Sequence, residues 1–185
     1  LLQQDAERAP FTVEFVEEPR VIDVGGVQTR IVLDRVDRLA DGTFAVIDYK
    51  TGASARPAAW MGERPELPQL PLYVRAIGQE QVSAVAFGIV CTGSTEYRGF
   101  ARDGEVFPQL KPFDATSAPF TDYASWGDLL QAWNRRLESL AREHAQGDAR
   151  LAPNPARACR YCHLRGVCRS AQALMEPEEG DDAAG

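Results

Sequence analysis

The chain has 185 residues, of which 44% are hydrophobic, and its 27 acidic and 20 Lys or Arg residues give a net charge of −7. This length is sufficient for one full hydrophobic core. No apolar run is long enough to span a bilayer, and the first residues do not have the pattern of a targeting signal. We therefore expect a soluble cytoplasmic domain. The acidic balance argues mildly against a stand-alone nucleic-acid binder.

Alternating and apolar stretches predict most of the regular structure. The expected elements, in chain order, are strands over 11–18, 21–24, 29–39 and 44–50, an irregular loop over 54–65, a helix over 67–77, strands over 82–91 and 96–100, a loop-rich stretch over 99–121 and a long helix over 125–146. Apolar residues at helical spacing in the last helix form a core stripe. This order predicts an α/β domain with a mixed central sheet.

Two neighbouring strands carry the most informative side chains. The stretches Leu33-Asp34-Arg35-Val36-Asp37 and Ile47-Asp48-Tyr49-Lys50-Thr51-Gly52 flank a turn of the Asp-Gly type at 41–42. A β-hairpin would bring Asp34 close to Asp48 and Lys50. Because side chains alternate along a strand, Asp48 and Lys50 share a face and Asp37 lies opposite Asp34. Because it lies on the opposite face, Asp37 is expected to have a supporting role; a register slip at a bulge would exchange the roles of Asp34 and Asp37.

Two carboxylates and an ammonium at the ends of two strands are typical of a divalent-metal site that hydrolyses a phosphate ester. The oxygen ligands of Asp34 and Asp48 favour Mg²⁺ or Mn²⁺ over zinc. Lys50 would orient or deprotonate the attacking water, or stabilise the charge of the transition state. The alternative is a surface hairpin with solvated charges, which would suit either Asp alone better than the pair.

These stretches resemble the nuclease domain of RecB/AddB-type helicase–nucleases, within the PD-(D/E)XK superfamily. The resemblance implies a restriction-endonuclease-like mixed sheet flanked by helices, with Asp34, Asp48 and the Tyr49 backbone carbonyl as metal ligands and Lys50 as the catalytic lysine. It also implies a Mg²⁺-dependent deoxyribonuclease, most simply an exonuclease, that acts on DNA ends in double-strand break repair together with a helicase domain or subunit. The superfamily commonly adds an acid or His from an early helix, for which we identify no residue; Glu14, Glu17 and Glu18 lie on or beside a strand.

A Gln-x-x-x-Tyr pattern follows the second strand. Gln69 and Tyr73 are four residues apart, so they lie on one face of the expected helix. The resemblance places this motif near the active site and the DNA, whereas spacing alone would favour an ordinary amphipathic helix. Pro71 inside the motif departs from the family pattern. It is compatible with a helix only if the helix begins near Pro68.

Three cysteines near the C-terminus form a C-x2-C-x5-C motif, Cys159, Cys162 and Cys168. The motif resembles the iron–sulfur motif of AddB-type nucleases, in which an upstream Cys is the fourth ligand of a [4Fe-4S] cluster. Cys91 lies in an apolar strand and is expected to be structural, so we expect an incomplete cluster here. Zinc with His163 as a ligand is the alternative. A disulfide framework is disfavoured.

These observations divide the chain into three parts. Residues 1–150 would form the nuclease core, truncated at its N-terminus, residues 151–175 a Cys-rich iron–sulfur module, and residues 176–185 an acidic disordered tail. Two alternatives to a nuclease remain. One is a catalytically silent DNA-binding or scaffold domain of a repair complex, and the other is an iron–sulfur module without a nuclease role.

Overall fold

The computed structural model describes residues 1–52, 55–150, 159 and 162–168. Internal contacts divide the chain into two units, Leu1–Gln146 and Gly147–Gly185. The first unit contains a six-stranded sheet in the order β1-β2-β3-β4-β5-β6, formed by Phe11–Val24, Val27–Leu39, Phe44–Lys50, Val82–Cys91, Ser94–Ala101 and Lys111–Pro112. The pairs β3–β4 and β5–β6 are parallel and the other pairs are antiparallel. The mixed sheet is consistent with the expected restriction-endonuclease-like α/β fold.

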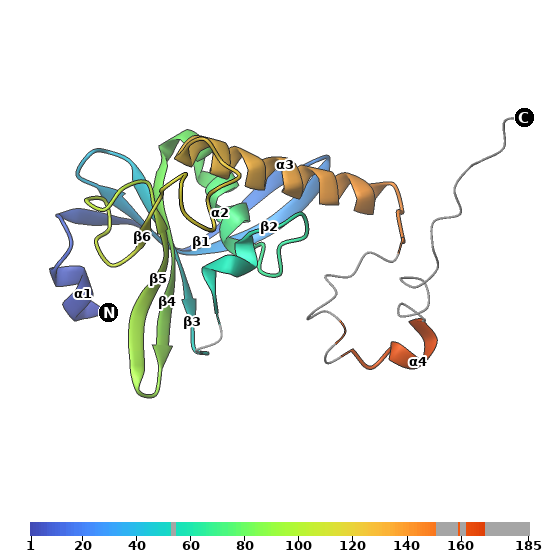
Figure 1. The fold of residues 1–185 in the computed structure, drawn as a ribbon, viewed down its shortest axis with the longest axis horizontal. Coiled ribbons are helices and arrows are strands. Elements are labelled where there is room, and N and C mark those ends of the chain that lie inside the picture. The colour runs from blue at the N-terminus through green and yellow to red at the C-terminus, as the bar shows by residue number, and fades with distance from the viewer. Residues whose placement is uncertain (53–54, 151–158, 160–161, 169–185) are drawn as a thin grey trace, which may run out of the picture. The chain divides into compact units, whose positions relative to one another are not determined.

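Helices lie on both faces of this sheet. The helices of the first unit are α1 (Leu2–Ala6), α2 (Gln69–Ile77) and α3 (Trp126–Ala145), with short 3-10 turns η1 (Pro57–Trp60) and η2 (Gln79–Gln81). The larger core packs α2, α3 and η1 against one face, here called the front face. On the reverse face, a smaller core contains Leu1 and residues of the segment 106–110. Figure 1 shows α1 and α2 on opposite sides of strands β3 to β5.

The β2–β3 hairpin forms as the sequence predicted. Leu39 donates its N–H to the Thr43 carbonyl at 2.8 Å, and Asp41 Oδ1 accepts from the Thr43 N–H at 2.9 Å. Gly42 has a positive φ of 82°, a conformation that a side chain would oppose. The tight turn therefore pairs β2 and β3 in the register Arg38↔Phe44 to Arg35↔Ile47.

Three expectations about the elements need correction. The strands expected over 11–18 and 21–24 are one strand, β1, because Pro19 is tolerated on the edge of a sheet. The loop expected over 54–65 contains η1, whose Trp60 is fully buried and packs against the rings of Phe87, Phe100 and Trp133. The stretch 1–10, for which no helix was expected, includes α1.

Helix α2 begins where the proline allows it. The helix starts at Gln69, with Pro68 as its N-cap residue, and the Leu72 N–H donates to the Pro68 carbonyl at 3.0 Å. Pro71 therefore lies in the first turn, where a missing N–H costs no helical hydrogen bond. This satisfies the condition that the sequence set for a helical Gln-x-x-x-Tyr motif.

The second unit, Gly147–Gly185, is described only in part. Helix α4 spans Arg165–Cys168, and the Cys168 N–H donates to the Leu164 carbonyl at 2.9 Å. The expected acidic tail and most of the stretch before Cys159 lie outside the described residues. No helix in the described ranges is long and apolar enough to cross a membrane.

Candidate active site

The predicted site residues come together on the front face, from the interior of β2, the end of β3 and the first turns of α2. We call this group the site cluster. Tyr73 donates its hydroxyl to Asp34 Oδ1 at 3.3 Å and accepts from Gln69 Nε2 at 2.6 Å. Lys50 Nζ donates to Gln69 Oε1 at 2.9 Å and lies 2.7 Å from Asp48 Oδ2. The contacts form a chain through all five members, Asp34, Tyr73, Gln69, Lys50 and Asp48.

Each element contributes for a local reason. The alternation of β3 directs Asp48 and Lys50 to the same face, and both contact or approach front-face residues. One helical turn separates Gln69 from Tyr73, so both reach the strands from the first turns of α2.

Tyr73 is 2% exposed, and burial together with the nearby carboxylates raises the pKa of its hydroxyl. It therefore stays a neutral donor to Asp34.

The alternation of β2 is interrupted near Asp34. Leu33 and Val36 are three residues apart, yet both pack in the front-face core. The neighbouring strand β1 carries a bulge between Val13 and Phe15. Strand β1 also has a positive φ of 51° at Glu17. This residue lies between the two registered β1–β2 residue pairs on either side of Asp34. Asp34 faces the site at this interruption, where its carboxylate accepts from the Tyr73 hydroxyl.

Asp48 is the least satisfied group of the site cluster. Its exposed fraction is 0%, and neither of its carboxylate oxygens accepts a hydrogen bond of ordinary geometry from the described residues. The Lys50 ammonium is in ion-pair contact with Oδ2 without the angle of a hydrogen bond. Burial raises the pKa of Asp48 to about 6; Lys50 opposes this rise and the charge of Asp34 adds to it. A buried carboxylate without hydrogen bonds is costly unless a cation completes it.

This donor set fits a hard divalent cation. The available donors are the carboxylates of Asp34 and Asp48 and the backbone carbonyl of Tyr49, and all are oxygens. The described part of the chain contains no group of three or more His, Cys, Asp or Glu side chains arranged for a metal ion. Two carboxylates suffice for Mg²⁺, which usually keeps several waters and takes one or two protein carboxylates. The unsatisfied oxygens of Asp48 are the observation that supports a cation here.

A second charged group lies on the reverse face, behind the site. Asp37, with an exposed fraction of 0%, accepts from Arg8 Nη1 at 2.8 Å and from Arg35 Nε and Nη2 at 2.6 and 2.9 Å. Asp5 of α1 accepts from Arg8 at 2.9 Å and from Arg35 at 3.0 Å. We call Asp5, Arg8, Arg35 and Asp37 the reverse cluster. Asp37 therefore lies opposite Asp34, as alternation predicted.

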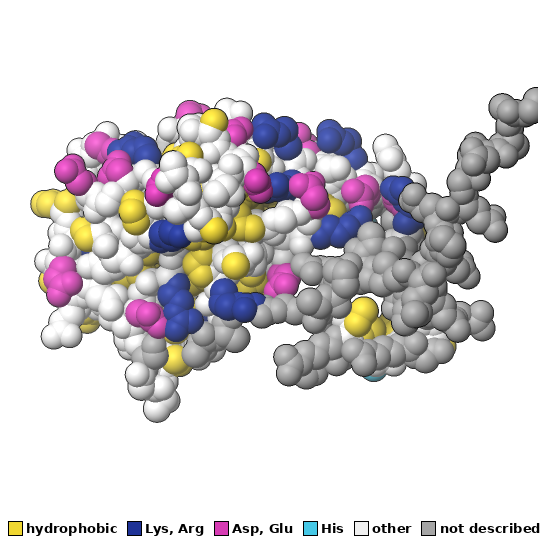
Figure 2. Space-filling view, in the orientation of Figure 1, with side chains coloured by type: hydrophobic (Ala, Val, Ile, Leu, Met, Phe, Trp, Pro, Cys, Tyr) yellow, Lys and Arg dark blue, Asp and Glu magenta, His cyan; other side chains and the backbone are white. Residues whose placement is uncertain are grey.

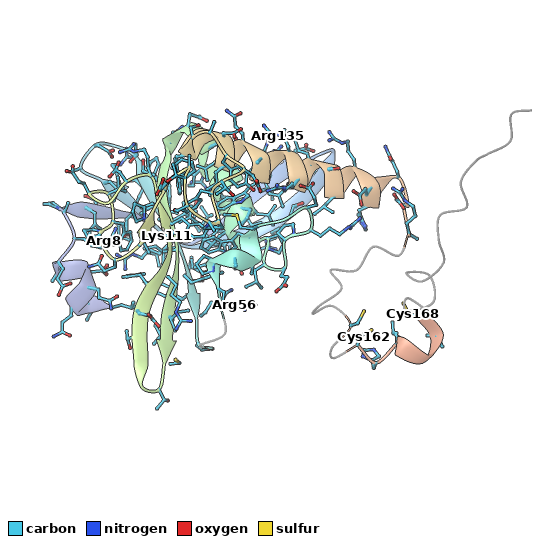
Figure 3. All side chains as sticks on the ribbon, viewed as in Figure 1. Arg8, Arg56, Lys111, Arg135, Cys162 and Cys168 are labelled. Carbon is cyan, nitrogen blue, oxygen red and sulfur yellow. The ribbon has the colours of Figure 1, made fainter. Side chains whose placement is uncertain are left out.

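The reverse cluster was largely missed by sequence reasoning. The pattern Asp34-Arg35-Val36-Asp37 was a signal for Arg35 and Asp37, but nothing in the sequence marked Asp5, Arg8 or the Tyr97 hydroxyl, which donates to Asp5 at 3.0 Å. Figure 3 shows Arg8 beside α1 and Arg56 near the end of β3, on opposite sides of the sheet. Asp5 is an acidic residue on an early helix, α1, but its partners are the arginines of the reverse cluster and not the site cluster.

Two of the acids considered as a further site acid are now placed. Glu14 forms an ion pair with Arg38 of β2 at 2.8 Å. Glu17 is exposed and has the positive φ already described. Neither contacts the site cluster.

None of the four cysteines, all of which belong to the described part of the chain, is in a disulfide. Cys91 ends β4 and is half-buried, in agreement with its expected place on a strand. Cys159, Cys162 and Cys168 belong to the second unit, and residues 160–161 between them lie outside the described residues.

Comparisons with known proteins agree with this geometry. The chain matches the PD-(D/E)XK nuclease superfamily over residues 1–169. Among solved structures, it is similar to the crystal structure of SSO0001, with 17% identity and a TM-score of 0.40 over 84% of this chain; the match spans 60% of that protein's chain. No curated protein matches the chain. On the match over residues 1–169, the chain belongs to the PD-(D/E)XK nuclease superfamily.

Proposed function

We propose that this chain is a metal-dependent deoxyribonuclease whose active site is the site cluster. The observation that carries the proposal is the carboxylate of Asp48, which is fully buried, lies beside the charge of Asp34 and is in ion-pair contact with Lys50 at 2.7 Å. Asp34, Asp48 and the Tyr49 carbonyl would hold Mg²⁺ or Mn²⁺. The ion supplies Lewis acidity and lowers the pKa of water at the scissile phosphodiester.

The protein's own residues supply position and charge. Lys50 is held by Asp48 on one side and by Gln69 on the other, so its ammonium has a fixed place beside the carboxylate. Its side chain is 28% exposed, which leaves it accessible to a phosphate or an attacking water. In this role it orients the water or stabilises the negative charge on the phosphoryl oxygens in the transition state. Gln69 and Tyr73 hold Lys50 and Asp34 in place.

The wider role is also a proposal. Action on DNA ends as an exonuclease, in double-strand break repair with a helicase domain or subunit, is supported by the RecB/AddB-like motifs around Asp34 and Asp48. A cytoplasmic location would suit this role. Cys159, Cys162 and Cys168 would supply three thiolates of a [4Fe-4S] cluster, and the fourth ligand is not identified among the described residues.

The test is cleavage of linear double- and single-stranded DNA by the chain with Mg²⁺ or Mn²⁺, with and without a chelator. We expect cleavage that requires metal, and a loss of about 10³-fold or more in Asp48→Asn, because the ion loses a principal ligand. The matched control is Asp122→Asn, since Asp122 is exposed. Equal cleavage by the wild type and Asp48→Asn would reject the site. Metal-dependent DNA binding without cleavage would favour the silent DNA-binding alternative.

A further inference from the structure

The backbone ladder between β2 and β3 ends just before the site. The last registered pair is Arg35↔Ile47, and among the described residues no such pair joins Asp34 to Asp48. One contact continues across the gap, a hydrogen bond of 2.9 Å from the Tyr49 N–H to Asp34 Oδ2. Beyond the pair Arg35↔Ile47, side-chain contacts therefore add to the sheet in holding the two carboxylates near each other.

On the reverse face, Arg35 spans this gap. Its Nη1 donates to the Tyr49 hydroxyl at 3.1 Å. Arg35 follows Asp34 and Tyr49 follows Asp48, so this hydrogen bond joins the two strands next to the two carboxylates. Asp37 holds the same guanidinium through two hydrogen bonds, and Asp5 accepts from it at 3.0 Å. Arg35 is thus a fixed donor.

The ring of Tyr49 is confined from its other side. Gly88 of β4 is its registered neighbour in the parallel pair β3–β4. A Cβ placed on Gly88 would lie 2.7 Å from Tyr49 Cδ1 and 2.9 Å from Cε1, closer than real Cβ atoms approach. The absence of a side chain at Gly88 therefore lets the ring lie against β4, with its hydroxyl at Arg35.

From these contacts we propose that Arg35 and the Tyr49 side chain are positioning residues for the metal site. Arg35 holds the Tyr49 hydroxyl, Gly88 accommodates the ring, and together they fix the segment Asp48-Tyr49-Lys50 against Asp34. The inference rests on the proposed function, because the group being positioned is the ligand set for the metal. Residues that orient ligands in this way commonly change metal affinity or activity by about 10- to 100-fold when they are mutated.

The test compares two Tyr→Phe variants that each remove one hydroxyl contact of Arg35 Nη1. Tyr49→Phe removes the contact to the site strand at 3.1 Å, whereas Tyr97→Phe removes a contact of 3.5 Å to β5. Tyr49 is 39% exposed, so its variant is expected to fold. Two quantities are measured: Mn²⁺ affinity by calorimetry, and, without metal, the hydrogen-exchange protection of the residue 49 amide by NMR.

We expect Tyr49→Phe to lower Mn²⁺ affinity about tenfold. We also expect it to lower the protection of the residue 49 amide about fivefold, the equivalent of one weak hydrogen bond. Tyr97→Phe should leave both quantities near the wild-type values. Gly88→Ala should act in the same direction as Tyr49→Phe, because the new methyl group displaces the ring. Thermal melting of each variant confirms that it is folded.

The proposal is overturned if Tyr49→Phe keeps both wild-type values, or if Tyr97→Phe lowers them equally. Failure of the proposed function looks different, because the wild type itself would then bind no Mn²⁺ and cleave no DNA. The metal-free exchange measurement would still decide whether Arg35 holds the Tyr49 segment against Asp34.

Discussion

The two faces of the sheet carry charged clusters within a few residues of each other, and the clusters differ in how well their charges are satisfied. On the reverse face, two arginines match two carboxylates, and Asp37 accepts three hydrogen bonds. The Nε and Nη2 atoms of Arg8 make no hydrogen bond among the described residues, and its guanidinium lies over the rings of Phe11 and Phe107. Burial alone would raise the pKa of Asp5, but hydrogen bonds from Arg8 and Arg35 bring it below its usual value. On the front face, burial raises the pKa of Asp48 to about 6 despite Lys50.

The difference separates a structural role from a chemical one. A buried ion cluster with matched partners holds elements together, and removing one partner leaves an uncompensated charge. A carboxylate that is buried without such partners costs stability, so it is retained for another reason, such as a bound cation. The reverse cluster therefore joins α1 to the sheet, while the site cluster, under the proposed function, would be completed by a bound cation. Figure 2 shows acidic and basic side chains interspersed over α3 on the face in view, with neither sign dominating.

The largest effect that tests this contrast is expected from Lys50→Met. We expect kcat to fall about 10²- to 10³-fold, because the site loses the cation beside the reacting phosphate. Metal affinity at pH 8 should stay close to that of the wild type, since an ammonium is not a ligand. Calorimetry with Ca²⁺ or Mn²⁺ and single-turnover cleavage measure the two quantities. Lys111→Met, at an exposed lysine on the short strand β6, is the control.

The same variant should respond more strongly to pH. Lys50 holds the pKa of Asp48 down, so its loss raises that pKa further. Metal affinity should then fall more between pH 8 and pH 6 in Lys50→Met than in the wild type. Weaker metal binding at pH 8 with an unchanged rate would contradict the role given to Lys50.

A smaller loss, this time of stability, is expected on the reverse face. Arg8 has a side chain 1% exposed, pairs with Asp5 and Asp37, and stacks between Phe11 and Phe107 with its Cζ 4.0 and 3.9 Å from the ring centroids. Arg8→Met should lower the free energy of unfolding by about 3 kcal/mol, measured in urea, because it leaves a buried carboxylate short of a partner.

The activity of Arg8→Met sharpens the comparison. Cleavage per folded molecule should change little, because Arg8 does not contact the site cluster. Arg38→Met breaks an exposed ion pair with Glu14 and should cost well under about 1 kcal/mol. An equal loss of stability in both variants would show that the reverse cluster is no more important than a surface pair.

Sequence reasoning succeeded where a local rule was sufficient. The Asp41-Gly42 turn fixed the register of β2 and β3, alternation placed Asp48 and Lys50 on one face, and helical spacing joined Gln69 to Tyr73. It failed where distant segments meet. Alternation does not reveal the interruption of β2 near Asp34, which lies opposite the positive φ of Glu17 in β1. The reverse cluster combines Asp5 with Arg35, thirty positions away. The burial of Trp60 likewise follows from tertiary packing rather than local pattern.

The smallest effect concerns the pH dependence of the metal-free chain. The folded-state pKa of Asp48, about 6, lies above its unfolded value near 3.8, so the native state binds more protons between these values. Its contribution to stability is therefore fully present below about pH 4 and is lost as the pH rises through about 6. The loss should not exceed about 3 kcal/mol. It is measured as the difference in unfolding free energy between the wild type and Asp48→Asn across this range.

Adding metal should reverse this dependence. A cation binds the ionised carboxylate, so saturating Mg²⁺ or Mn²⁺ should stabilise the wild type most above pH 6 and leave Asp48→Asn almost unchanged. Asp37 provides the internal comparison, since its carboxylate already has two guanidinium partners. Stability that rises between pH 4 and pH 6 in the metal-free wild type, relative to Asp48→Asn, would mean that Lys50 alone satisfies Asp48. The contrast between the two faces would then be lost, because both clusters would be complete without an ion.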